Sequence, residues 1–429
     1  MKYFSLNRQS PAVSFKEATI LGQGPDKGLY FPETIPQLPA GFINQLEHLS
    51  NEEIAYRVIQ PYVGDEIPEA ELRRIVAETV NFPLPLKHIA RHVYSLELFH
   101  GPTLAFKDIG ARFMSRCLGY FVKDSNRKVT VLVATSGDTG GAVAAGFYDV
   151  PGVEVVILYP SGKVSPVQEK QLTTLGKNIR ALEVNGSFDD CQRLVKQAFA
   201  DPEQTKKHFL TSANSINVAR WLPQQFYYFL ACKQSPHKDR PPVICVPSGN
   251  FGNICAGILA WASGLPVSHF IAACNENDTV TRYLQSGNWE PREAVPTLSN
   301  AMDVALPSNF VRILEVFRQQ LPEIRKMLSS VKVSDATTLE VIRYVKEESG
   351  YLLDPHGAVA YEALVHYLQQ HPQHWGYLLE TAHPVKFPDA IQKATGEEVA
   401  IPEDLLPLLQ KEKVATRIEP DYEAFIACL

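Results

Sequence analysis

Hydrophobic and polar residues follow a repeating strand-then-helix pattern along the middle of the chain. KVTVLVAT (128–135) is a continuous run of β-branched and apolar residues, which is typical of a buried strand. A turn, SGDTG (136–140), leads into a helix of small residues over 141–150. Further strands are expected over 153–160, 178–186, 243–246 and 267–274, with helices between them over 165–175, 187–199 and 254–263. This alternation predicts an α/β protein with a parallel sheet.

No charged side chain occurs between Pro241 and Asn275. Prolines and glycines break this stretch below the length that spans a bilayer. Because parallel strands are buried on both faces, we expect buried structure here and no membrane segment.

The ends of the chain depart from this pattern. Residues 51–61 and 69–80 have helical periodicity among turn motifs, and residues 285–350 are helical in pattern and rich in charge. We therefore predict three parts: an N-terminal domain over 1–95, a smaller α/β domain over 96–225, and a larger α/β domain over 226–429 with a helical insertion near 285–350.

Composition narrows the classes of function. The 429 residues include 41 Lys and Arg against 47 Asp and Glu, and the net charge of −6 gives no broad attraction to nucleic acid or to an anionic membrane. Seven cysteines without a C-x-x-C pair fit free thiols in a reducing compartment. The N-terminus has no apolar signal-peptide segment, so we predict a cytoplasmic protein. Neither H-E-x-x-H nor a Cys/His cluster occurs, so no metal site is expected.

The loop after the strand over 243–246 is a candidate anion site. It reads SGNFGN (248–253), and its two glycines would let the backbone approach a ligand closely. The helix that follows offers free N–H groups that favour a phosphate. The loop is neither a lysine-containing P-loop nor a G-x-G-x-x-G dinucleotide motif. From these residues alone, a plain strand-to-helix turn is an equally good interpretation.

Two other segments carry candidate chemistry. The turn from Thr135 to Gly140 places several hydroxyl and N–H groups at a helix start, where they would bind a carboxylate or simply cap the helix, the second being the commoner case.

Lys107 follows Leu104-Ala105-Phe106. If it is buried, its pKa falls and its amine becomes a usable nucleophile. The alternative is a solvent-facing lysine at the start of a helix over 108–120.

These segments together resemble one family, the threonine synthases. The matching motifs occur in that family's order: DKGLYFP (26–32), LELFHGPTLAFKD (96–108), ATSGDTGGAVA (134–144), SANSINVAR (212–220), VPSGNFGN (246–253) and TAHP (381–384). The resemblance covers nearly the whole chain. It implies the fold of fold-type II enzymes that depend on pyridoxal 5′-phosphate (PLP), which is similar to tryptophan synthase β, with parallel sheets, flanking helices and an N-terminal extension.

The resemblance also implies roles for particular residues. Lys107 would bind PLP covalently and act as general base, Phe106 would wall the pyridine ring, and the Thr381 hydroxyl would face the pyridine nitrogen. The PLP phosphate would be held by Ser248, Gly249, Asn250, Phe251, Gly252 and Asn253. The substrate carboxylate is expected at Thr135, Ser136, Asp138 and Thr139, and the substrate phosphate at Lys163, Asn214, Asn217 and Arg112. Many relatives carry Asn where this chain has Asp138, so this residue either faces the substrate or caps the helix.

The family's reaction converts O-phospho-L-homoserine and water to L-threonine and phosphate. An alternative in the same class is a phospho-lyase that gives 2-oxobutyrate from the same substrate. Because both reactions share their early steps, the expected cofactor residues do not separate them. The sequence does not distinguish a monomer from a homodimer.

Overall fold

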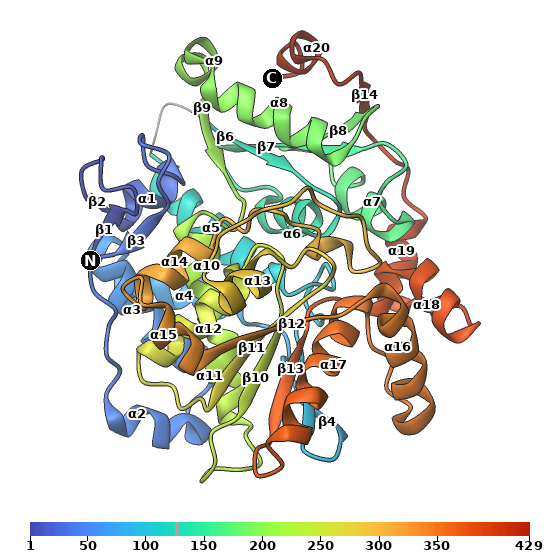
Figure 1. Ribbon diagram of the computed structural model, residues 1–429. Helices are drawn as coiled ribbons and strands as arrows, with labels where there is room; N and C mark the ends of the chain where they lie inside the picture. Colours follow the sequence, from blue (N-terminus) through green and yellow to red (C-terminus); the bar gives the residue numbers. More distant parts are fainter. Residues whose placement is uncertain (125–127) are drawn as a thin grey trace.

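Two larger sheets and one small sheet organise the protein (Figure 1). The computed structural model describes residues 1–124 and 128–429. The six-stranded sheet has the order β12-β11-β10-β13-β5-β4 and is parallel except at its β5–β4 edge. Its strands are β4 (Leu86–Ala90), β5 (Val93–Glu97), β10 (Val243–Pro247), β11 (His269–Cys274), β12 (Leu328–Lys332) and β13 (Gly376–Glu380).

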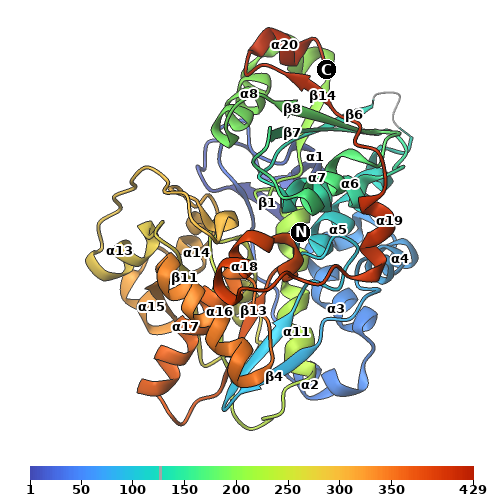
Figure 2. The same ribbon diagram turned by 90° about the vertical axis from the view of Figure 1, so that its right-hand side faces the viewer.

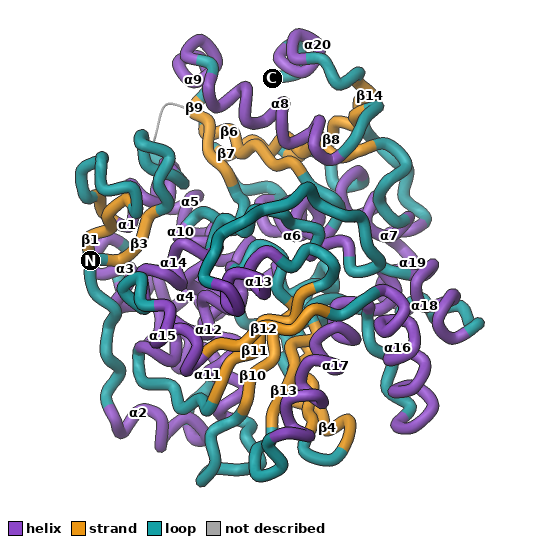
Figure 3. The backbone as a smooth tube through the Cα atoms, in the orientation of Figure 1, coloured by secondary structure: helices purple, strands orange, loops and turns teal. Residues whose placement is uncertain are grey.

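The five-stranded sheet is parallel throughout and has the order β14-β8-β7-β6-β9. Its strands are β6 (Val129–Ala134), β7 (Val153–Pro160), β8 (Ile179–Val184), β9 (Phe209–Ser212) and β14 (Thr416–Ile418). Every residue of β6 is buried, as expected for a strand covered on both faces. Figure 3 shows the strands of the two larger sheets as separate groups.

Helices fill the space between the two sheets and cover their outer faces (Figures 1 and 2). Between the sheets lie α5 (Lys107–Val122), α6 (Asp138–Phe147) and α10 (Val218–Trp221). The outer face of the five-stranded sheet is covered by α8 (Phe188–Ala200), whose Ser187 forms a capping box with Asp190. Against the six-stranded sheet pack α12 (Gly252–Ala262) and α17 (Pro355–Gln370), which in turn contact α11 (Gln225–Lys233) and α16 (Asp335–Ser349), respectively.

The N-terminal region adds a small antiparallel sheet and short helices. The sheet contains β1 (Lys2–Ser5), β2 (Val13–Ser14) and β3 (Tyr30–Pro32), and the helices are α1 (Phe15–Leu21), α2 (Ala40–Gln45), α3 (Asn51–Val63) and α4 (Glu69–Thr79). The remaining helices are α7 (Pro166–Thr173), α9 (Pro202–Lys207), α13 (Thr279–Ser286), α14 (Phe310–Val316), α15 (Leu321–Met327), α18 (Pro388–Thr395), α19 (Leu406–Leu409) and α20 (Tyr422–Ile426). One apolar core runs without a break from this N-terminal region into both sheets.

The strands predicted from the sequence are present, but the predicted domain boundaries do not match the way the strands are divided between the sheets. The strands β4 and β5, which lie at the end of the predicted first domain, belong to the six-stranded sheet. Near the C-terminus, β14 pairs with β8 of the other sheet. Residues 285–350 also contain β12, which pairs with β11, so this region is not a purely helical insertion. Local patterns do not reveal such pairings because the partners lie far apart in sequence.

Two further expectations concern the chain as a whole. All seven cysteines are unpaired thiols. Within residues 1–124 and 128–429, no helix combines the length and the apolar character needed to cross a membrane.

Candidate active site

The segment that carries Lys107 is held by the strand end opposite it. The N–H of Phe106 donates to the Thr381 carbonyl at 2.9 Å, and the N–H of His383 donates to the Leu104 carbonyl at 3.1 Å. The Tyr227 hydroxyl donates to the Phe106 carbonyl. These bonds exist because β5 and β13 are parallel neighbours, so the loops at their carboxyl ends meet. The backbone of Lys107, the first residue of α5, is thereby fixed.

The Lys107 amine lies in a nearly dry position. Its side chain is only 16% exposed, so the solvent-facing alternative does not apply. Within the described residues the amine makes no hydrogen bond; it lies 3.7 Å from the Asp138 carboxylate and 4.6 Å from the centre of the Phe106 ring. Burial lowers the pKa of Lys107, and the nearby negative charge of Asp138 opposes this effect only in part. A lowered pKa keeps more of the Lys107 side chain in the uncharged amine form, which is the form that acts as a nucleophile or general base.

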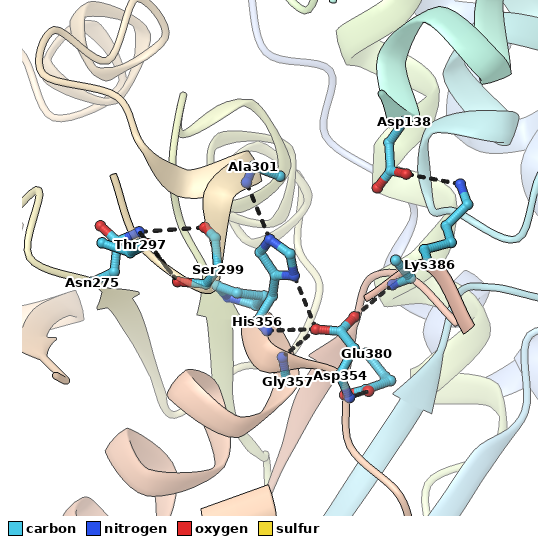
Figure 4. Close-up of polar contacts among 12 residues, drawn as sticks. Asp138, Asn275, Thr297, Ser299, Ala301, Asp354, His356, Gly357, Glu380 and Lys386 are labelled. Atoms are coloured by element: carbon cyan, nitrogen blue, oxygen red, sulfur yellow. Dashed lines mark hydrogen bonds and ion pairs between the residues drawn. The ribbon is translucent and has the colours of Figure 1, made fainter. Parts of the chain in front are cut away.

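Asp138 is shared with a second lysine (Figure 4). Its Oδ1 accepts hydrogen bonds from Lys386 Nζ at 2.8 Å and from Gln168 Nε2 at 3.0 Å. The Lys386 side chain is fully buried, at the end of the short 3-10 helix η5 (Pro384–Lys386). Burial alone would raise the pKa of Asp138, but the ammonium groups of Lys386 and Lys107 keep it below its ordinary value. Lys386 was not identified from the sequence, although it lies only two residues after the TAHP motif.

The loop Ser248–Asn253 presents unpaired backbone donors. In the described parts of the chain, the five consecutive N–H groups from Gly249 to Asn253 have no hydrogen-bond acceptor. Phe251 adopts a left-handed conformation, with φ of 61°, as the loop enters α12. The side chain of Asn250 bonds to Ser215 at 2.8 Å and so links the loop to the SANSINVAR segment. A row of free N–H groups before a helix is suited to a phosphate.

Gly249 also lies close to a second segment of the chain. A Cβ on this residue would lie 2.7 Å from Met302 Cα and 2.8 Å from the Ala301 carbonyl oxygen. The close approach is therefore to another segment of the chain, which backs the loop. At Gly252 a Cβ would be tight but would not overlap, with the Asn309 amide nitrogen at 3.3 Å.

The turn after β6 combines helix capping with free donors. The buried Thr135 hydroxyl accepts from the N–H groups of Gly137 and Gly140, each at 2.9 Å. The N–H groups of Ser136, Asp138 and Thr139 have no acceptor among the described residues. Thr135 therefore bonds to the start of α6, whereas the next residues keep free N–H groups of the kind that a carboxylate can accept.

Thr381 directly follows β13, next in the chain to Glu380, which belongs to a buried acidic network (Figure 4). Its side chain is buried, and its hydroxyl has no partner in the part of the chain that the structure describes. The next residue, Ala382, donates its N–H to Asp354 at 3.0 Å. Asp354 caps α17, accepts from His356 Nδ1 at 2.9 Å, and donates its own N–H to Glu380 at 2.6 Å. The network fixes the backbone on which Thr381 stands.

Protonation within this network follows from burial and from the neighbouring charges. Burial raises the pKa of Glu380 well above its ordinary value, and the negative charges of Asp354 and Glu97 add to the shift. Oε2 of Glu380 has no hydrogen-bond partner among the described residues. The far nitrogen of His356 accepts from the N–H of Ala301 at 3.3 Å, so the network reaches the segment that backs Gly249. Neither Asp354 nor Glu380 was identified from the sequence.

Comparison with known proteins identifies the family. A family profile described as "Threonine synthase N terminus" matches residues 2–80, "Pyridoxal-phosphate dependent enzyme" matches 79–375, and "Threonine synthase, C-terminal" matches 357–428. Threonine synthase of Haemophilus influenzae is 46% identical over 418 residues, which is 96% of either chain. The chain belongs to the threonine synthase family.

Solved structures of threonine synthases agree with this conclusion. The Escherichia coli enzyme matches with a TM-score of 0.92 and 44% identity, covering all of this chain and 99% of the other. A PLP-bound threonine synthase from Brucella melitensis matches with a TM-score of 0.93 and 37% identity, covering all of this chain and 98% of the other. The fold-type II architecture expected from the sequence is confirmed, and so is membership of a PLP-dependent class of enzymes.

The site of this threonine synthase family member fits PLP on the residues present. The free N–H groups of Gly249–Asn253 suit its phosphate, the unpartnered Thr381 hydroxyl suits its pyridine nitrogen, and Lys107 offers an amine beside the Phe106 ring. Among the described residues, no group of three or more His, Cys, Asp or Glu side chains could hold a metal ion.

The four predicted ligands of the substrate phosphate fall into two groups in this family member. Lys163 is exposed and Asn214 half-buried, and neither side chain has a hydrogen-bond partner within residues 1–124 and 128–429. The Arg112 guanidinium instead donates twice to the Glu78 carbonyl, at 3.0 and 2.6 Å. Asn217 is fully buried; it caps α10 and donates to the Thr19 carbonyl at 2.9 Å. Arg112 and Asn217 are thus engaged in holding the fold, and the structure does not bring them to the site.

Proposed function

We propose that this chain converts O-phospho-L-homoserine and water to L-threonine and phosphate. The observation that carries the proposal is the Lys107 amine, which is nearly buried and lacks a hydrogen bond to any described residue, together with two sets of free backbone donors in the loops that follow β10 and β6. One set, at Gly249–Asn253, suits the cofactor phosphate, and the other, at Ser136, Asp138 and Thr139, suits a substrate carboxylate. The name shared by the relatives supports the same reaction.

The chemistry divides between cofactor and protein. When bound, PLP would withdraw electrons from the substrate carbon that bears the amino group, which makes the Cα proton and then a Cβ proton acidic and so allows phosphate to leave from Cγ. The lowered pKa of Lys107 favours its uncharged amine, which can take the Cα proton and return it after Cγ has gained a proton and water has added at Cβ. The Thr381 hydroxyl would meet the pyridine nitrogen without adding a charge.

The strand order supports a site for the substrate phosphate. The turn with Asp138 follows β6, the loop with Lys163 follows the neighbour β7, and Asn214 follows the other neighbour, β9. The carboxyl ends of adjacent parallel strands lie at one edge of a sheet. We assign the phosphate to Lys163 and Asn214, because a dianion calls for a cation together with oriented donors.

Product analysis in ¹⁸O-labelled water tests the proposed reaction. With PLP and O-phosphohomoserine, we expect threonine with the label in its hydroxyl group and phosphate without label, because the C–O bond is the one that breaks. Formation of 2-oxobutyrate would identify a phospho-lyase. Homoserine with labelled phosphate would identify a phosphatase. Either product in place of threonine overturns the proposal.

We also propose that the protein acts in the cytoplasm. Its seven unpaired cysteines are compatible with a reducing compartment. Fusion to a fluorescent protein and microscopy in the native host would test this location.

A further inference from the structure

Two lysines converge on the single carboxylate of Asp138. Lys386 Nζ lies 2.8 Å from Oδ1, whereas Lys107 Nζ lies 3.7 Å from Oδ2. Gln168 adds a second donor to Oδ1 at 3.0 Å. Lys386 therefore makes the direct charged hydrogen bond, and Lys107 is left beyond hydrogen-bond distance.

This arrangement matters because the surroundings are dry. The side chains of Lys386 and Asp138 are 0% and 5% exposed, so their charges act through a medium of low dielectric constant. An unpaired carboxylate next to Lys107 would favour the ammonium form of that lysine. An ammonium group has no lone pair and cannot attack a carbonyl carbon. Asp138 without a second cation would therefore oppose the proposed role of Lys107.

We propose that Lys386 neutralises Asp138 and so keeps the Lys107 amine uncharged, ready to bond to the aldehyde of PLP. In that step the nitrogen lone pair forms a bond to the aldehyde carbon, and the two amine protons leave with the aldehyde oxygen as water. Lys386 is thus a positioning residue that acts through Asp138. The inference rests on the proposed function in one respect, the assignment of PLP to Lys107.

The other groups that face Lys107 agree with this balance of charge. Burial is the largest cause of its lowered pKa; the Asp138 carboxylate opposes it, and the positive charges of Lys386 and then Arg220 add to it. Asp354, at the start of α17, has a smaller raising effect. Arg220 is buried, and its Nε has no hydrogen-bond partner in the described parts of the chain. Two cations and two carboxylates therefore surround Lys107, and removing one cation leaves an excess of negative charge.

Charge variants of the apoprotein separate this role from a structural one. We would prepare Lys386→Met, Lys386→Arg, Asp138→Asn and the double variant Lys386→Met/Asp138→Asn, and remove PLP from each. Competitive labelling with acetic anhydride, read by mass spectrometry over about pH 6 to 10, gives the titration midpoint of Lys107 directly. The rate at which added PLP forms its visible absorbance band gives a second readout.

The variants have opposite expected effects. Lys386→Met raises the midpoint and slows PLP coupling near neutral pH by about tenfold for each pH unit of the shift. Asp138→Asn lowers the midpoint, while the double variant and Lys386→Arg stay near the wild type. A purely structural role of Lys386 would reduce the extent of labelling without moving the midpoint. An unmoved midpoint in both single variants overturns the inference.

The outcome is independent of turnover. If the midpoints move as expected but no threonine forms, the proposed reaction fails and the inference stands. If threonine forms and the midpoints do not move, only the inference fails. Should Lys386→Met not fold, Asp138→Asn and the double variant still decide the question, because their expected midpoints differ.

Discussion

Tyr227 and Tyr228 are consecutive residues of α11, yet their hydroxyls bond to two different parts of the site. Tyr227 donates to the Phe106 carbonyl, next to Lys107, and Tyr228 donates to the Asn253 carbonyl at 2.7 Å. Both side chains are fully buried. One helix therefore sets the position of the Lys107 segment relative to the phosphate loop.

Replacing Tyr228 by Phe should loosen the phosphate loop. The Asn253 carbonyl would lose one hydrogen bond in a buried position, which costs about 1 kcal/mol of folding free energy. We expect weaker PLP retention together with a lower Tm. Tyr3→Phe is a matched control, because its buried hydroxyl also donates to a carbonyl, that of Tyr62, at 2.7 Å and belongs to the N-terminal sheet. This control should lower Tm but leave the dissociation constant of PLP unchanged, as measured by fluorescence titration.

Lys107→Ala should abolish the covalent attachment of PLP and lower kcat by at least about a hundredfold, because both nucleophile and general base are lost. Borohydride reduction of the wild type followed by peptide mapping should place the cofactor on Lys107. A label on Lys386 or on another lysine would contradict the assignment.

Thr381→Val keeps the shape of the side chain but removes its hydroxyl. We expect PLP to remain bound and kcat to fall about fivefold, the effect of losing a hydrogen bond of about 1 kcal/mol. Thr381→Ser should retain most of the activity, since it preserves the hydroxyl. Equal losses in the two variants would show that the hydroxyl has no part in the reaction.

Gly249→Ala should force apart two segments of the backbone. The new Cβ would overlap Met302 Cα and the Ala301 carbonyl, and overpacking of this kind costs about 1–3 kcal/mol. We expect lower stability to urea and weaker PLP binding. Gly41→Ala is the control, because its Cβ would meet only the Gln45 amide nitrogen, at 4.0 Å, in α2, where alanine favours a helix by about 1 kcal/mol. A Gly249→Ala protein as stable as the wild type would show that the two segments can separate without cost.

Glu380→Gln should change the pH dependence of stability. The raised pKa of Glu380 means that the folded state keeps a proton which the unfolded state releases above about pH 4.5. Its contribution to folding is therefore full below that pH and declines as pH rises towards the pKa in the folded state. Glutamine does not titrate, so the variant should gain stability relative to the wild type by up to about 1.4 kcal/mol per pH unit in this range. Urea unfolding at several pH values measures the difference; a constant difference would show that Glu380 is ionised in the fold.

Much of the fold follows from local sequence patterns. VEVVILYP predicts a strand over 153–160, and β7 has those bounds. Ser187 and the carboxylates after it predict the start of α8 and form the capping box that the structure shows. In contrast, β12 reads LSSVK and is not predicted, because its two serines interrupt any apolar run. The strand lies at the sheet edge, where it has only one neighbour.

The site is less predictable because its contacts join distant segments. Lys386 donates a hydrogen bond to Asp138, which lies 248 positions away in the sequence. Ala382, just after β13, donates to Asp354 at the start of α17. Arg112 lies five residues after Lys107 in α5, so the two side chains leave the helix about 140° apart. Helix geometry alone therefore predicts that Arg112 does not face the same side as Lys107. Asn217 precedes a helix, and Asn is a preferred cap, so the sequence did contain evidence for its structural role.

The bond between Asp138 and Lys386 joins the loops of two different sheets, since Asp138 follows β6 and Lys386 follows β13. Any motion that widens the gap between these sheets must pull two opposite charges apart where little water can solvate them. The ion pair therefore resists any separation of the two sheets, and weakening it would lower the free-energy cost of moving them apart.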